Sequence, residues 1–213
     1  MPNWCSNSIE IVGPRDKIRA LWLDAKQSEG LLNALRPQPA GLDITAGREG
    51  PDGSPEQVAL EAREAENLEK HGARNWYDWN VNNWGTKWDV GLDGLEYEED
   101  ADGNFDNGTG IPHARITGWF DSAWAPPTNA VAYFCETNPD VRVTLDYYEP
   151  GMCFVGRMIA DNGEVEEDDC VDYADATSKT VRDIVGSEMC DFWNLEEELA
   201  SYEEDEEDEE ENA

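Results

Sequence analysis

The first thirty residues change from the two-residue period of a β-strand to the 3.6-residue period of an α-helix, which limits the folds open to the chain. Polar and apolar residues alternate in SNSIEIVG (Ser6–Gly13), with Ile9 and Ile11 on one face. Pro14 ends this pattern, and the residues after it carry apolar side chains at helical spacing as far as Gly30. The segment predicts a strand followed by an amphipathic helix.

The same succession returns in the second half of the chain. A short helix is expected in APPTNAVAYFCETNP, and Asp161-Asn162-Gly163 is a typical hairpin turn. Further strands are expected at Gly85–Leu92, Ala114–Trp124, Val141–Glu149, Met152–Ala160 and Glu164–Glu166. Split β-α-β units of this kind favour an α+β fold, a ferredoxin-like antiparallel sheet with helices packed on one face.

Residues 1–168 are predicted to form this domain, with a helical insertion at about 31–74. Within the insertion, Ser54 is a suitable N-cap and Pro55 a suitable first helical residue. Residues 169–202 show apolar spacing typical of a C-terminal helical segment, and residues 203–213 are expected to be a disordered acidic tail.

The formal net charge is −34, and the nine consecutive carboxylates of Glu203–Glu211 account for only part of it. Such a chain repels nucleic acid and anionic membranes, so we expect no direct binding to either. Three interpretations of the charge stay open: a solvated tail, adaptation to high salt, and mimicry of nucleic acid.

Five cysteines, an odd number without C-x-x-C spacing, favour free thiols in a reducing compartment. The N-terminus has no signal-peptide pattern, and no apolar run has the length of a membrane span. We therefore expect a cytoplasmic protein, located in the host cytoplasm if a phage encodes it.

Several motifs occur in the order of a known family: MPNWCSNSIEIVGP, LRPQP, NWGTKWD, FDSAWAPP and YYEPGMCFVGR. Together they resemble the YubB ferredoxin-like domain family of bacteria, plasmids and phages, from about Met1 to about Ala160. The resemblance implies a ferredoxin-like fold and an accessory role such as counter-defence, without an established biochemical activity. The chain departs from the family at Ala125, where a serine is usual, and in its acidic extension.

Four of the nine tryptophans fall within residues 75–90, NWYDWNVNNWGTKWDV. One interpretation packs Trp84 and Trp88 in the core; the other exposes Trp76, Tyr77 and Trp79 as a surface for a peptide, sugar or base. Lys87 is expected to pair with Asp89 or another carboxylate. The candidate binding residues are Trp76, Tyr77, Trp79, Asn82, Trp84, Lys87, Trp88 and Trp124.

No catalytic motif or cofactor fingerprint appears, so an enzyme is not expected and no cofactor is predicted. A calcium loop beginning at Asp100, with Asp102 and Asn104 as further ligands, fails because Phe105 and Ile111 occupy its glycine and glutamate positions. The dispersed cysteines and two histidines do not predict a zinc site either, so no metal site is expected.

The acidic C-terminal arm is the second candidate binding region. Its candidate residues are Glu196, Glu197, Glu198, Glu203, Glu204, Asp205, Glu206, Glu207 and Asp208. A partner of this arm should be basic, such as a host nucleic-acid-binding or defence-related protein. The sequence thus favours a non-enzymatic phage or plasmid interaction protein that acts by charge mimicry. The alternative is a small-ligand or peptide-binding module that uses the tryptophan-rich segment, with acidity serving solubility or salt adaptation.

Overall fold

The computed structural model describes residues 3–100, 105 and 110–211, the last seven of these by their backbone alone. Six strands and eight helices follow one another in this part of the chain. They are β1 (Trp4–Pro14), α1 (Arg15–Ser28), α2 (Leu31–Leu35), α3 (Pro55–His71), α4 (Trp76–Asn83), β2 (Leu95–Glu99), β3 (His113–Ala123), α5 (Thr128–Thr137), β4 (Arg142–Glu149), β5 (Phe154–Asp161), β6 (Glu164–Asp172), α6 (Val181–Val185), α7 (Ser187–Trp193) and α8 (Leu195–Glu211).

The strands form one antiparallel sheet in the order β2-β3-β1-β4-β5-β6. Strand β1 pairs with β3 on one side and β4 on the other, and Ile9 lies opposite both Gly118 and Leu145. The order β2-β3-β1-β4 is that of two split β-α-β units, and β5 and β6 extend the sheet beyond β4. The predicted α+β class and ferredoxin-like sheet are confirmed.

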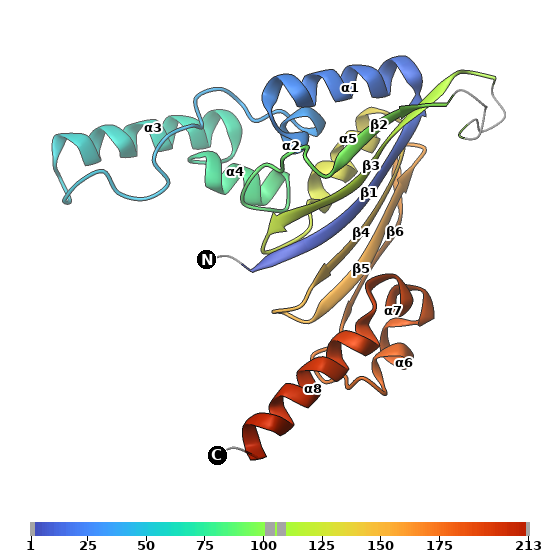
Figure 1. The fold of residues 1–213 in the computed structure, drawn as a ribbon. Helices are drawn as coiled ribbons and strands as arrows, with labels where there is room; N and C mark the ends of the chain where they lie inside the picture. The colour runs from blue at the N-terminus through green and yellow to red at the C-terminus, as the bar shows by residue number, and fades with distance from the viewer. Residues whose placement is uncertain (1–2, 101–104, 106–109, 212–213) are drawn as a thin grey trace.

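Alternate residues of the strands build the main core on the face that α1, α2 and α5 cover (Figure 1). Ile9 and Ile11 of β1 are fully buried there beside Val143 and Leu145 of β4. Every second residue is buried because neighbouring side chains of a strand point to opposite faces of the sheet.

A second, smaller core lies on the opposite face, where α6, α7 and α8 meet the sheet. The Trp119 ring of β3 stacks on Phe192 of α7 at 5.4 Å, and Tyr148 of β4 lies 5.4 Å from the Trp193 ring. The expectation of helices on one face holds for α1, α2 and α5, and the C-terminal helices add a layer on the other. Burial of Tyr148, which is 8% exposed, favours this cover, whereas Trp119 remains 50% exposed at its border.

The strand expected at Gly85–Leu92 does not form, and β2 follows it instead. The carboxylate of Asp89 accepts N–H groups of Leu32 and Asn33, which ties this segment to α2. In β2, buried Leu95 and half-buried Tyr97 alternate with glutamates. The sequence predicts no strand here, because an acidic segment that continues into Gly, Asn and Asp residues is typical of a loop.

The expected boundaries also shift. Strand β6 runs to Asp172, so the boundary predicted after residue 168 falls inside a strand. Within the predicted insertion, α2 buries its three leucines in the main core, whereas α3 projects away from the sheet (Figure 1). Ser54 caps α3 as expected and accepts the N–H of Gln57.

Helix α8 continues to Glu211, where the sequence analysis predicts a disordered tail from residue 203. Leu195 at its start is fully buried in the second core. Glutamate has a good helix propensity, and carboxylates in the first turn stabilise a helix by interacting with its dipole. A helix anchored at Leu195 can therefore extend into the acidic residues that follow. Among the described helices, none combines the length and apolar content needed to cross a lipid bilayer.

Gly118 provides a test of the β2–β3 pairing. Its φ is +143°, and an added Cβ would lie 2.0 Å from the carbonyl oxygen of Gly94. We expect Gly118→Ala to lower the free energy of unfolding by at least about 2 kcal/mol in urea denaturation, because strain and a backbone clash act together.

Gly91→Ala is the matched control, since no atom lies within 4 Å of its Cβ position and its φ is not in the left-handed region. This control should change stability by less than about 0.5 kcal/mol. Equal denaturation midpoints for the two variants would contradict the described pairing.

Candidate functional site

Much of the tryptophan-rich segment is helical. Asn75 caps α4 by accepting the N–H groups of Tyr77 and Asp78. After the helix, the amide of Asn80 donates to the carbonyl of Lys87, and the Thr86 hydroxyl donates to the carbonyl of Ala123 at 2.8 Å. These contacts fix the segment against the end of β3.

Two of the candidate tryptophans belong to the core. Trp79 and Trp84 are 5% and 3% exposed and meet edge to face at 5.6 Å. The indole N–H of Trp84 donates to the carbonyl of Arg36 at 2.8 Å, so this polar group is satisfied. The core prediction is therefore confirmed for Trp84, while the expectations of an exposed Trp79 and a buried Trp88 are wrong.

Lys87 does not pair with Asp89, contrary to the expectation. Its Nζ lies 4.4 Å from the ring centre of Trp88 and 4.9 Å from that of Trp124. The ring of Tyr77 is 5.7 Å away, so three aromatic rings surround one ammonium group. We call Tyr77, Lys87, Trp88 and Trp124 the aromatic cluster.

Asp89 instead accepts backbone N–H groups of Leu32, Asn33 and Val90. Burial raises the pKa of this carboxyl, although the three hydrogen bonds oppose the shift. Asp89 thus ties its own segment to α2 through backbone hydrogen bonds, and Lys87 contacts aromatic rings instead of this carboxylate.

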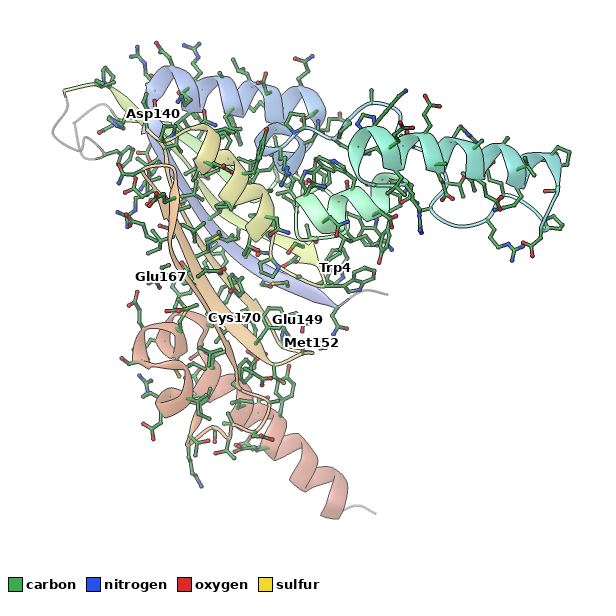
Figure 2. All side chains as sticks on the ribbon, turned by 180° about the vertical axis from the view of Figure 1, so that it is seen from behind. Trp4, Asp140, Glu149, Met152, Glu167 and Cys170 are labelled. Atoms are coloured by element: carbon green, nitrogen blue, oxygen red, sulfur yellow. The ribbon has the colours of Figure 1, made fainter. Side chains whose placement is uncertain are left out.

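Trp4 extends the aromatic cluster, since its ring lies 6.1 Å from that of Trp88 and is 48% exposed. Figure 2 shows Trp4 at the same end of the sheet as Glu149 and Met152, opposite the end that holds Asp140. Trp4 is not a candidate from the sequence, because only the pairing of β1 with β3 brings it there.

Trp76 and Trp88 line a shallow cleft of about 540 Å³ beside the aromatic cluster. Its other wall is the connection after α2. In this connection, the backbone N–H of Gln38 donates a hydrogen bond to the side-chain oxygen of Asn33. The remaining lining residues are Pro39, Ala40, Gly41 and Asp43. Asn82 is exposed and does not line the cleft.

The second candidate surface is acidic and centres on β6, the outermost strand on its side of the sheet. Six of its nine residues are carboxylates: Glu164, Glu166, Glu167, Asp168, Asp169 and Asp172. None of the six forms an ion pair within the described part of the chain. None of the six is a candidate from the sequence, where the strand is expected to end at Glu166 and the C-terminal arm is the candidate acidic region.

The beginning of the acidic arm attaches α8 to the domain. Arg182 donates to Glu196 at 2.8 Å and to Asp191 at 2.7 Å. The carboxylate of Glu203 accepts both the N–H and the hydroxyl of Ser178 at 2.8 Å. These two predicted binding residues therefore have structural contacts.

The other arm residues differ in their surroundings. Glu197 accepts the side-chain amide of Asn194, Glu198 accepts the hydroxyl of Tyr202, and Glu204 is exposed. The side chains of Asp205, Glu206, Glu207 and Asp208 lie outside the described residues.

The described residues hold no group of three or more His, Cys, Asp or Glu side chains arranged to bind a metal ion. Asp102 and Asn104 of the rejected calcium loop lie outside these residues. His113 is buried, with its Nδ1 2.6 Å from the carbonyl oxygen of Ile111.

A family model described as "Ferredoxin-like domain in Api92-like protein" matches residues 96–212, more than half of the chain. The match includes α6, α7 and α8, and it supports the expected ferredoxin-like family. Among solved structures, the chain is similar to a crystal structure of protein api92 from Yersinia pseudotuberculosis. The identity is 12%, the TM-score is 0.45, and the match covers 79% of this chain and 98% of that chain. No curated protein matches the chain.

The division of the tryptophans into core and surface can be tested by truncation. Trp84→Ala should lower the free energy of unfolding by about 3–5 kcal/mol, because it leaves a large cavity in the main core. Trp88→Ala should cost less than about 1.5 kcal/mol, since it removes a ring that is already 38% exposed. Chemical denaturation measures both, and similar losses in the two variants would contradict the assignment.

The attachment of α8 should depend on pH. Hydrogen bonds from Arg182 lower the pKa of Asp191 and Glu196 from their ordinary values of 3.8 and 4.5, and those from Ser178 lower the pKa of Glu203. A lowered pKa in the folded state means that the contact stabilises the fold above the ordinary pKa and is lost as pH falls through the lowered one.

We therefore expect the Ser178 amide and the Trp193 indole resonances in ¹H–¹⁵N spectra to shift together below about pH 4.5. Arg182→Gln should weaken the pH dependence of the Trp193 resonance and leave the Ser178–Glu203 contact in place. Transition midpoints at or above the ordinary carboxyl pKa values of 3.8 and 4.5 in the unmodified protein would contradict this attachment.

Proposed function

This chain belongs to the family of ferredoxin-like domains in Api92-like proteins, and we propose that it acts as a non-enzymatic interaction protein whose acidic surface binds a basic partner. The surface combines strand β6 with the acidic helix α8. Its YubB-like motifs favour an origin on a phage or plasmid and a role in counter-defence. A cytoplasmic location, in the host cell if a phage encodes the protein, is part of this proposal.

The observation that carries the proposal is the row of carboxylates on β6. Nine strand residues span about 30 Å, so the six carboxylates, which are divided between the two faces of the sheet, give one charge per about 5 Å along its edge. One strand of duplex DNA carries a charge per about 3.4 Å, which is a similar linear density. A basic groove that binds nucleic acid would therefore meet a comparable field at this edge of the sheet.

The distribution of cations supports the same conclusion. Arg157 and Arg182 each bind two carboxylates elsewhere in the domain. The β6 carboxylates have no ion-pair partner in the described chain, so they are available to an external cation. Association with a basic nucleic-acid-binding or defence-related host protein would be fast and would weaken with salt.

A second candidate function uses the cleft between Trp76 and Trp88. Two indole rings and the polar side chains of Asn33, Gln38 and Asp43 line it. Aromatic faces with a few polar groups are typical of small-ligand and peptide sites. In that case the acidity of the chain would serve solubility or salt adaptation.

A capture experiment with matched charge variants separates the two functions. We compare the full-length protein with the triple variant Glu164→Gln, Glu166→Gln and Asp168→Asn in retaining proteins from bacterial lysate, identified by mass spectrometry. The proposal expects basic nucleic-acid-binding proteins on the unmodified chain, and about tenfold less of them on the β6 variant.

The control removes the same number of charges from the projecting helix α3, at Glu56, Glu64 and Glu69. It should retain the basic proteins at low salt, and about 0.5 M salt should release them from both chains. Equal retention by the two triple variants would overturn the β6 surface. Retained proteins that are lost only with Trp88→Ala would favour the second candidate function.

A further inference from the structure

Besides its charge, the β6 region contains a cavity of about 510 Å³ between the sheet and the C-terminal helices. Strands β5 and β6 form one wall, and residues of α6 and α7 with the turn between them form the other. Figure 2 shows Glu167 and Cys170 where the sheet meets these helices. The cavity opens beside the outermost strand, which has no further strand on its outer edge.

We propose that this cavity is an anchor pocket for one lysine or arginine side chain of the basic partner. The inference rests on the proposed function, because it assumes that the partner binds along β6. The inference adds to the proposed function a defined position at which one cationic side chain of the partner inserts into this domain.

The inner lining of the pocket is apolar. Strand pairing places Val171 of β6 opposite Val155 of β5, and both line the cavity with Val185 and Met189 of the helical wall. Lysine and arginine carry a long aliphatic stem below their charge and commonly bury it along apolar surface. A lining of this kind therefore suits the stem of a cationic side chain.

The charges of the pocket suit the head group. Its one cation, Arg157, donates to Asp146 at 2.5 Å and to Glu188, so its charge is offset within the domain. Glu167 and Asp169 also line the cavity and form no ion pair among the described residues. An ammonium or guanidinium group would supply the partner that these two carboxylates lack.

Other occupants fit less well. An anion would meet Glu167, Asp169 and Glu188 against one guanidinium that is already paired. A metal ion is disfavoured because the described side chains form no cluster of three or more ligating residues. Charged residues on an edge strand also protect against aggregation, but that role does not require a cavity with an apolar lining.

The test compares two pairs of substitutions on the same strand in the full-length protein. Glu167→Gln with Asp169→Asn removes the carboxylates that line the pocket, whereas Glu166→Gln with Asp168→Asn removes two that do not. The probe is a short fluorescein-labelled peptide of alternating lysine and threonine, and fluorescence anisotropy gives its Kd at low salt and again at about 0.5 M salt.

We expect the pocket pair to raise the Kd about tenfold and the outer pair about twofold. Because both pairs change the net charge equally, the difference between them measures the contribution of the pocket. Ser187→Trp should also raise the Kd about tenfold, because it fills the exposed rim of the cavity without removing a carboxylate. Thermal unfolding checks that each variant remains folded.

Equal effects of the two pairs, together with unchanged binding by Ser187→Trp, would overturn the anchor pocket and leave the acidic surface intact. Binding that neither pair weakens and that salt does not affect would overturn the proposed function as well. The two failures are thus distinguishable in one set of measurements.

Discussion

The pairing of β1 with both β3 and β4 is the interaction on which the rest of the structure depends. Its register places Ile9 and Ile11 on the face that becomes the main core, and it places Ser8 beside Trp119 on the other face. The second face then carries Tyr148, which the C-terminal helices bury, and Trp119, which stacks on Phe192 of α7. Both layers of helices, and the cavity between β6 and α7, follow from this one alignment.

The few cations of this acidic chain determine which carboxylates remain free. Arg157 and Arg182 join the C-terminal helices to each other and to the sheet, and Lys87 lies among aromatic rings. Each cation that forms an ion pair within the domain is no longer available to neutralise carboxylates elsewhere on the surface. Among the described strands, β6 carries the largest number of carboxylates without an ion pair, and we therefore propose it as the site for a basic partner.

The tryptophan-rich segment shows how far spacing can predict the role of a residue. Trp79 and Trp88 lie nine residues apart in the same segment, yet one is buried and the other is exposed. The difference arises from helix α4 and from the hold of Asp89 on α2, neither of which the sequence pattern revealed. Trp4 joined the aromatic cluster through strand pairing across more than one hundred residues.

By itself, the sequence determined the α+β class, the order of β1, α1, β3, α5, β4 and β5, and the capped helix α3, because these depend on local periodicity and on turn and cap residues. Only the tertiary structure decided which tryptophans are exposed, that α7 covers the second face, that β6 extends to Asp172, and that a cavity lies beside it. These features depend on contacts between residues far apart in the chain, and local patterns do not encode which distant partner a side chain will meet.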